Sequence, residues 1–351
     1  MAIDNILEQI NQEKITRRTI LKVGLATGVG LASLSVAGCT SPGVTPSLAP
    51  TASPLKSAVP GGWLPSDHQA AIFIAEAKGY FKKYGLNIQL QKFAAGPVLM
   101  QQVSGGKLDI GFAGVAPIIS TIDSDPTIKI VAALQGNGSG IIVGNDTGIN
   151  KVADLDGKKI AVPSVGSIQD IMLRQLLKNN NIDYSKQTIS AIGAGQMPAA
   201  ISAGSIDAAF TWEPFVTQAE MKNLGKVLIR SEDIIPNHPC CAVATTTAMI
   251  QQYPDTLKAF FQAQNDATQY ILNAANAQDT AATISGADYL ADEAAIEAAA
   301  LPKIRFLAKP DEIFISGTES FAKEMKALNL LKKDHDRSDI FDLSLINQVI
   351  K

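Results

Sequence analysis

The chain has 351 residues, of which 46% are hydrophobic, and a formal net charge of −3 at pH 7. After residue 39 it contains few arginines, which are Arg174, Arg230, Arg305 and Arg337. They form no basic stripe of the kind that a nucleic-acid-binding surface needs, so we expect no nucleic-acid partner. Its three cysteines, two of them adjacent, cannot form a disulfide framework.

The N-terminal residues have the features of an export signal followed by a lipid attachment site. Arg17-Arg18 precedes an uncharged stretch, Val23–Ala37, and small residues then lead to Cys39. The stretch is shorter than the roughly 20 residues that a helix needs to cross a bilayer. This order resembles a twin-arginine signal peptide ending in a lipobox, so we expect residues 1–38 to be a signal peptide and Cys39 to carry lipid. The alternative is an apolar N-terminus without a targeting role.

Residues 39–60 are predicted to be a flexible tether. They are rich in Pro, Ser, Thr, Ala and Gly, with one charge, Lys56, and no aromatic residue. Such a segment cannot bury enough apolar surface to offset its loss of conformational entropy. The remaining ~290 residues are long for one compact core and suit two lobes.

The periodicity of apolar residues predicts alternating strands and helices. Strands are predicted over 86–93, 108–112, 128–134, 159–162, 188–192, 208–211, 227–229 and 242–245. Helices are predicted over 67–84, 97–104, 117–123, 168–179, 197–203 and 214–223, and the chain is predicted almost wholly helical from residue 253. This alternation predicts an α/β fold with mostly parallel sheets flanked by helices.

Two segments share one pattern of residues. Gly106–Phe112 and Gly204–Phe210 both place Gly, an aliphatic residue, Asp and Phe at the same positions, and Pro117 or Pro214 follows. Glycine suits the end of a helix, and proline suits the first turn of the next one. The pattern predicts one copy of the same unit in each lobe, although such residues are also common punctuation in α/β proteins.

Six segments in order carry a resemblance to a known family; they are residues 68–75, 78–86, 106–117, 152–162, 166–170 and 207–214. They resemble the solute-binding proteins of ABC importers for nitrate, sulfonate, taurine and bicarbonate, a group that shares its fold with thiamine-pyrimidine-binding proteins. The resemblance covers about residues 62–330 and implies a two-lobe periplasmic-binding-protein-like fold of type II, with the ligand cleft between the lobes. Lobe 1 would comprise residues 60–143 and 246–351, including the helical C-terminal region, and lobe 2 would comprise residues 144–245.

In such a cleft, strand ends lead into helix N-termini, whose free backbone N–H groups can bind an anion without arginine. The candidate ligand-binding residues are His68, Gln69, Gly96, Gly114, Val115, Ser164, Gly166, Ser167, Gln169, Trp212, Glu213 and His238. Alternatives stay open for several of them. Ser167 either contacts the ligand or is only a helix N-cap, and Trp212 either lines the cleft or packs in the core. Glu213 either complements a helix dipole or pairs with the ammonium group of a zwitterion.

The sequence His238-Pro239-Cys240-Cys241 allows several interpretations. The pair can be two buried thiols or a vicinal disulfide. A structural zinc site needs four ligands, and this motif supplies at most three. These three lie too close together in the sequence to share one ion, so we expect no metal. A Cys–His nucleophile pair lacks a visible third group to orient the histidine.

We therefore expect a lipid-anchored, extracytoplasmic solute-binding protein of an ABC importer, not an enzyme, with no cofactor. Its expected partners are a small polar or anionic solute, the permease with its ATPase, and the membrane through Cys39, and we expect a monomer. One alternative is an enzyme on the same fold, of the thiamine-pyrimidine-synthase kind, although that family's cysteine-rich iron motif is absent. Another is a ligand sensor that docks on a membrane receptor.

Overall fold

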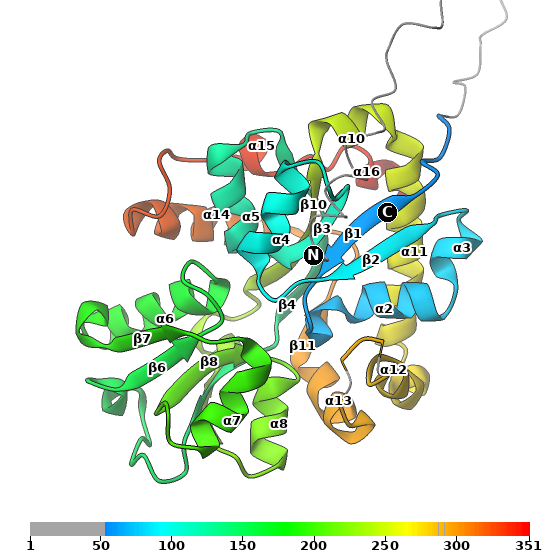
Figure 1. Cartoon of the computed structure of the whole chain (residues 1–351). Coiled ribbons are helices and arrows are strands. Elements are labelled where there is room, and N and C mark those ends of the chain that lie inside the picture. The colour runs from blue at the N-terminus through cyan, green and yellow to red at the C-terminus, as the bar shows by residue number, and fades with distance from the viewer. Residues whose placement is uncertain (1–52, 287, 291) are drawn as a thin grey trace, which may run out of the picture. The chain divides into compact units, whose positions relative to one another are not determined.

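The computed structural model describes residues 53–286, 288–290 and 292–351 (Figure 1). The expected signal peptide, with Arg17, Arg18 and Cys39, lies outside the described residues. None of the helices within the described ranges is long and apolar enough to cross a membrane.

The described chain folds around two sheets. The first has six strands in the order β11-β4-β10-β3-β1-β2: β1 Val59–Trp63, β2 Ile88–Lys92, β3 Ile110–Gly114, β4 Ile128–Asn137, β10 Pro239–Thr246 and β11 Ile304–Phe306. The second has five strands in the order β7-β6-β8-β5-β9: β5 Ser139–Val143, β6 Lys159–Val162, β7 Thr188–Ala191, β8 Ala208–Trp212 and β9 Lys226–Arg230. We call the six-stranded sheet with its helices the first lobe, and the five-stranded sheet with its helices the second lobe.

Both sheets are mixed, and in each of them most strands run in one direction, as the expected α/β fold with mostly parallel sheets requires. β1 runs parallel to β2 and β3, and β6 runs parallel to β7 and β8. β10 is antiparallel to β3 and β4, and β5 is antiparallel to β8 and β9. The parallel pairs are joined through helices, whereas the antiparallel strands β5 and β10 enter their sheets directly from the other lobe, so they need no crossover helix.

Helices cover both faces of the first sheet. α2 (Ala70–Ala77), α3 (Tyr80–Lys83) and α11 (Pro254–Leu272) pack together, and α4 (Gly96–Ser104) packs on α5 (Val115–Ser124) (Figure 1). The helix predicted over 67–84 is interrupted at Gly79, whose φ is 74°. Phe260 of α11 stacks on Phe112 of β3 with ring centroids 5.8 Å apart, which joins helix and sheet into one core.

The second sheet is also covered on both sides. α6 (Ile168–Asn179) packs with α9 (Ser231–Ile234), and α7 (Met197–Ser202) packs with α8 (Phe215–Met221). Residues 168–179 were predicted as a helix from their apolar periodicity, and α6 confirms this prediction. Its Ser167 N-cap side chain accepts a hydrogen bond from the backbone N–H of Asp170.

The two copies of the repeated pattern adopt the same local structure. Gly106 after α4 has a φ of 69°, and Gly204 after α7 has a φ of 67°. These left-handed conformations favour glycine and let each helix end and turn into the next strand, β3 or β8. One copy lies in each lobe, where the pattern predicted it.

The region after residue 246 is mostly helical, as predicted, with β11 as an added edge strand of the first sheet. Its α-helices besides α11 are α10 Thr247–Gln252, α12 Ala277–Ile284, α13 Ala294–Ala300, α14 Glu312–Ala327, α15 Arg337–Ile340 and α16 Ile346–Val349. Short 3-10 helices complete the described chain: η1 Asp67–Gln69, η2 Val152–Leu155, η3 Tyr184–Lys186, η4 Ala194–Gln196, η5 Ala274–Asn276 and η6 Leu301–Lys303. α13 packs against α8, so this region also contacts the second lobe.

The residues just before β1 are held against the first lobe, which corrects the expected end of the tether at residue 60. The backbone N–H of Lys56 donates to Thr256 Oγ1 over 2.9 Å. Its ammonium group lies 2.5 Å from Asp109 Oδ1. Residues 53–60 therefore belong to the folded part, and residues 39–52 of the predicted tether lie outside the described residues.

Candidate functional site

A small cavity of about 30 Å³ lies where strand ends of the two lobes meet. Eight of the residues predicted from the sequence line it: His68, Gln69, Gly96, Gly114, Ser164, Ser167, Gln169 and Trp212. They lie at the carboxyl ends of β1, β2, β3, β6 and β8, either as the last residue of the strand or in the segment that follows it. Parallel strands bring their carboxyl ends to one edge of a sheet, so the crevice at that edge collects these loops from both lobes.

Three helices begin at the cavity. Gly96 is the first residue of α4, Gly114 is the N-cap of α5, and Ser167 is the N-cap of α6. The first backbone N–H groups of a helix have no partner within the helix and carry partial positive charge. The cavity is thus lined by backbone donors, and within the described residues no Asp, Glu, Lys or Arg side chain lines it.

The N-terminus of α6 is held in place by a buried carboxylate. Asp170 accepts hydrogen bonds from the backbone N–H of Gly166 over 2.9 Å and from the hydroxyl of Tyr184 over 2.5 Å. Burial raises the pKa of Tyr184, and its bond to Asp170 raises it further. Ser167 Oγ caps the helix as an acceptor, so its hydroxyl proton stays available to a ligand.

Two glutamine side chains line the cavity, and they differ in their hydrogen bonding. Gln169 donates from Nε2 to Ser139 Oγ over 2.9 Å, which ties α6 to the start of β5. Gln69 is fully buried, and neither atom of its amide has a hydrogen-bond partner within the described part of the chain. Since a buried polar group without a partner costs free energy, the Gln69 amide is a donor and acceptor prepared for a bound molecule.

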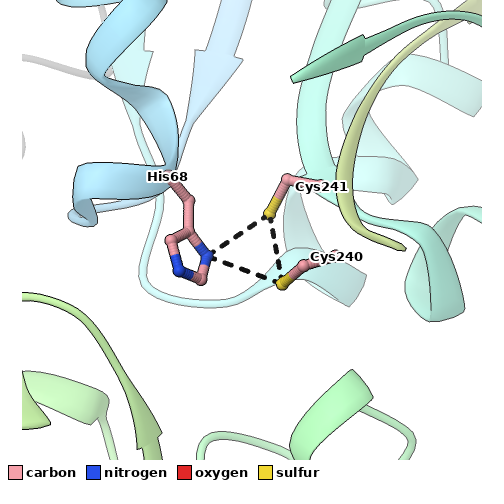
Figure 2. Close-up of side chains that lie close together, drawn as sticks. All are labelled: His68, Cys240 and Cys241. Carbon is pink, nitrogen blue, oxygen red and sulfur yellow. Dashed lines mark hydrogen bonds between the residues drawn. The ribbon is translucent and has the colours of Figure 1, made fainter. Parts of the chain in front are cut away.

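His68 links the first lobe to the chain segment that crosses to the second. Its Nε2 lies 2.8 Å from the carbonyl oxygen of Gly138, the residue between β4 and β5. A carbonyl only accepts, so Nε2 is a donor, and Nδ1 is the ring nitrogen that faces the two cysteines. Nδ1 lies 3.5 Å from Cys240 Sγ and 3.8 Å from Cys241 Sγ (Figure 2).

Both cysteines are buried and line the same cavity. Adjacent residues of a regular strand point to opposite faces. The pairing of β10 with β4 shifts register between Pro239 and Cys241, so β10 carries an extra residue there. Such a bulge redirects a side chain, and here the two sulfur atoms lie 4.0 Å apart on the same side (Figure 2).

The contact between the two thiols makes them chemically unequal. A hydrogen bond between the sulfur atoms lowers the pKa of Cys240, and the same contact raises the pKa of Cys241. Cys240 is therefore the thiol that loses its proton first. The contact is between free thiols.

Four predicted residues are placed elsewhere. Val115 packs in the hydrophobic core, and Gly166 lines a neighbouring surface hollow. Glu213 is buried, with Oε1 3.0 Å from Arg230 Nη1 and Oε2 accepting from the backbone N–H of Thr217. His238 is buried beside Phe321, and its Nδ1 lies 3.1 Å from the carbonyl oxygen of Pro239.

These placements decide several open alternatives. Ser167 is both an N-cap and a cavity residue, and Trp212 lines the cavity while its Nε1 donates to the carbonyl oxygen of Pro65 over 3.3 Å. Glu213 is neutralised by Arg230, so it is not available to pair with a ligand ammonium group. The sequence did not identify Cys240 and Cys241 as cavity residues. Their adjacency was the visible signal, but the bulge that turns both inward leaves no mark in the sequence.

Comparison with known proteins places the fold. Residues 52–285 match the NMT1-like family. The putative aliphatic sulfonates-binding protein of Bacillus subtilis is 28% identical over 202 residues, which are 56% of this chain and 60% of that protein. The taurine-binding periplasmic protein of Escherichia coli is 30% identical over 208 residues, 57% of this chain and 63% of that protein. The match thus spans less than two thirds of the length of either relative.

A solved structure shows the same fold. The periplasmic nitrate-binding protein NrtA from Synechocystis PCC 6803 superposes with a TM-score of 0.74 at 19% sequence identity, covering 85% of this chain and 89% of that one. The likeness extends over both lobes, and the fold is therefore that of the periplasmic binding proteins.

Proposed function

The chain belongs to the NMT1-like family, and from this premise we propose that it is the extracytoplasmic solute-binding lipoprotein of an ABC importer. It captures a small polar or anionic solute of the sulfonate, taurine, nitrate or bicarbonate class and delivers it to the permease and its ATPase. The similar proteins are named as binding proteins for sulfonates, taurine and nitrate, and this supports the proposed class of solute.

One observation carries the proposal: three helix N-termini meet at a buried cavity between the lobes. An anion bound there accepts hydrogen bonds from backbone N–H groups, from Ser167 and from Gln69. Because no basic side chain lines the described cavity, recognition relies on these dipoles, each worth roughly 0.3–1 kcal/mol and more when buried.

Binding closes the two lobes around the solute. The chain passes between them at Gly138, where φ is 76°, and again between Arg230 and Pro239. We propose these two segments as the hinge. This choice places β5 (Ser139–Val143) in lobe 2 and β10 (Pro239–Thr246) in lobe 1, whereas the sequence predicted lobe 1 as residues 60–143 and 246–351 and lobe 2 as residues 144–245. A solute that contacts both lobes shifts the population towards the closed state.

The lipid anchor rests on the sequence alone. Arg17-Arg18 would direct export, and lipid on Cys39 would keep the binding protein in the plane of the membrane where its permease lies. Such confinement raises the effective concentration of the carrier at its partner.

Two alternative functions, a ligand sensor and an enzyme, would use the same site. A sensor that docks on a membrane receptor would bind the same solutes, and a neighbouring permease and ATPase gene pair favours the importer. An enzyme on this fold gains support from the Cys240–His68 contact, where Gly138 orients the histidine. Turnover of a bound solute, followed by mass spectrometry, would identify an enzyme.

A ligand screen tests the proposed function. The chain without residues 1–39 is heated with taurine, alkanesulfonates, nitrate, bicarbonate or a pyrimidine, and its unfolding temperature is measured. A solute at about 100 times its Kd adds about 2.7 kcal/mol to the free energy of unfolding. No shift with any of these solutes contradicts the proposed solute classes.

Two tryptophan variants locate the binding event. Trp212→Ala removes a wall of the cavity, and we expect at least ~30-fold weaker binding, since loss of a buried aromatic contact costs roughly 2 kcal/mol or more. Trp63→Phe is the matched control, because Trp63 packs on Phe73 in the first lobe and leaves the cavity unchanged. Unchanged affinity in the Trp212 variant would place binding elsewhere.

A further inference from the structure

The side chains of His68, Cys240 and Cys241 converge on one point of the cavity wall (Figure 2). They come from parts of the sequence about 170 residues apart, and all three are buried. The expectation of no metal rested on His238, the histidine next to the cysteines in sequence. In the folded chain His238 lies against Phe321, and His68 takes the place beside the two sulfur atoms.

The distances among the three ligand atoms suit a single metal ion. Zinc bonds of ~2.3 Å to sulfur and ~2.0–2.1 Å to nitrogen, at angles between tetrahedral and trigonal, separate two sulfurs by ~3.8–4.0 Å and sulfur from nitrogen by ~3.6–3.8 Å. The observed sulfur–sulfur distance is 4.0 Å, and the two sulfur–nitrogen distances are 3.5 and 3.8 Å. The triangle therefore already has the dimensions of a coordination site.

The histidine is also oriented as a metal ligand. Nε2 donates to the carbonyl oxygen of Gly138, so the lone pair of Nδ1 points at the two sulfur atoms. A metal-binding histidine characteristically donates its other N–H to a carbonyl or carboxylate, which fixes the ring and its tautomer. Gly138 fits closely here: a Cβ at this position would lie 2.7 Å from His68 Nε2, so only glycine allows this approach.

The donor set and the charge select the kind of ion. Two sulfurs and one imidazole are soft and borderline donors, which suit zinc rather than calcium or magnesium. Two thiolates balance the charge of a divalent ion, so the loaded site is neutral, as a cavity without charged side chains among the described residues requires.

We propose that His68, Cys240 and Cys241 form a three-ligand site for Zn²⁺, with its fourth coordination position open to the cavity. The unpartnered, fully buried amide of Gln69 lines the same cavity and can hydrogen-bond to a water molecule or solute at that position. Loading the site releases the two thiol protons to solvent and changes no oxidation state. The proposal goes beyond the proposed function, because it stands whichever solute the cavity accepts.

Metal binding is measured on the full-length chain carrying Cys39→Ser, in which Cys240 and Cys241 are the remaining cysteines. The protein is reduced, freed of metal with a chelator, and titrated with Zn²⁺ against a chromophoric competitor. We expect one ion per chain. Co²⁺ in place of Zn²⁺ should give the intense visible bands of a four-coordinate ion and sulfur-to-cobalt charge transfer, a readout that needs no change to the three ligands.

Single substitutions identify the ligands. Cys240→Ser, Cys241→Ser and His68→Gln should each weaken Zn²⁺ binding by more than the roughly 10- to 100-fold that loss of an outer-shell partner costs. His238→Gln is the matched control, since this buried histidine precedes the cysteines but faces Phe321, and it should leave the affinity unchanged. Circular dichroism checks that each variant is folded.

Three results would overturn the proposal. The first is a reduced chain that holds no Zn²⁺ against the competitor, and the second is a Co²⁺ spectrum without sulfur-to-cobalt charge transfer. The third is a purified chain, denatured without reductant, whose mass is two hydrogens lower, which would assign the pair to a vicinal disulfide. The solute screen is independent of these outcomes, so failure of the metal site and failure of the proposed function are distinguishable.

Discussion

Acidic side chains beside the cavity have partners that set their charge. Glu213 is paired with Arg230, whereas the carboxyl groups of Asp67 and Glu297 lie against each other. Neither has another hydrogen-bond partner in the part of the chain that the structure describes. Two ionised carboxylates only accept hydrogen bonds, so this contact forms when one of them holds a proton.

This pair predicts that stability falls as pH rises towards neutrality. Burial is the main cause that raises the pKa of both groups, well above its usual value for Asp67 and to about 7 for Glu297. Between about pH 4.5 and pH 7 the native chain therefore binds more protons than the unfolded chain, and its free energy of unfolding decreases with pH. Glu297→Gln should flatten this decrease, measured as unfolding temperature against pH.

The control for this prediction is Glu293→Gln, which changes an exposed carboxylate just before α13. It should keep the slope of the unsubstituted chain between about pH 4.5 and pH 7. Equal slopes in the Glu297 variant and the unsubstituted chain would show that the buried pair does not hold the proton.

The sequence predicts a cavity residue correctly where the residues next to it in the sequence already indicate its position. Ser164, Ser167 and Gln169 follow a strand and open a helix, so their place at the strand ends could be read from neighbouring residues. His68 was also predicted at the cavity, but its contact with Cys240 and Cys241 joins distant segments and depends on the bulge in β10. Neither the bulge nor the left-handed turn at Gly138 has a local signature strong enough to predict.

Elements with clear periodicity and caps were predicted well. β6 and α6 have the bounds that the sequence predicts, since a short apolar run defines β6 and the Ser167 N-cap begins α6. β1 was not predicted, because the sequence Pro60-Gly61-Gly62 is typical of a linker. It is nevertheless a strand between β2 and β3. The side chains packed against it leave room only for small residues.

Gly62 allows a direct test of this explanation. A Cβ at Gly62 would lie 2.6 Å from Leu108 Cδ1 and 2.9 Å from Leu99 Cγ, closer than packed atoms approach. We expect Gly62→Ala to lower the free energy of unfolding by about 1–3 kcal/mol, the usual cost of overpacking a core. Urea unfolding measures the change.

The matched control is Gly193→Ala, because a Cβ there meets nothing closer than 3.5 Å and the backbone φ is −56°. This variant should be as stable as the unsubstituted chain or slightly more stable, since alanine restricts the unfolded state. A Gly62 variant with unchanged stability would mean that β1 can shift, and that packing does not explain its glycine.

For the whole molecule, the two lobes are joined by two chain crossings and by contacts around the cavity. Ser66 Oγ donates to the carbonyl oxygen of Glu213 over 3.2 Å, and the backbone N–H of Asp67 lies 3.3 Å from the same oxygen. Trp212 Nε1 donates to the carbonyl oxygen of Pro65 in the opposite lobe. The two-lobe fold was predicted from the family resemblance, whereas these contacts arise between segments that local patterns do not relate.

Such contacts must open when a solute enters, so amide exchange should report closure. At a solute concentration about 100 times the Kd, we expect the Asp67 amide to exchange about 100-fold more slowly, because binding stabilises the closed lobes by about 2.7 kcal/mol. The Thr147 amide, in a turn of the second lobe bonded to Gly144, exchanges by local opening and should be unaffected. If calorimetry detects binding while Asp67 exchange stays the same, the lobes do not open at this contact and the solute must enter without hinge motion.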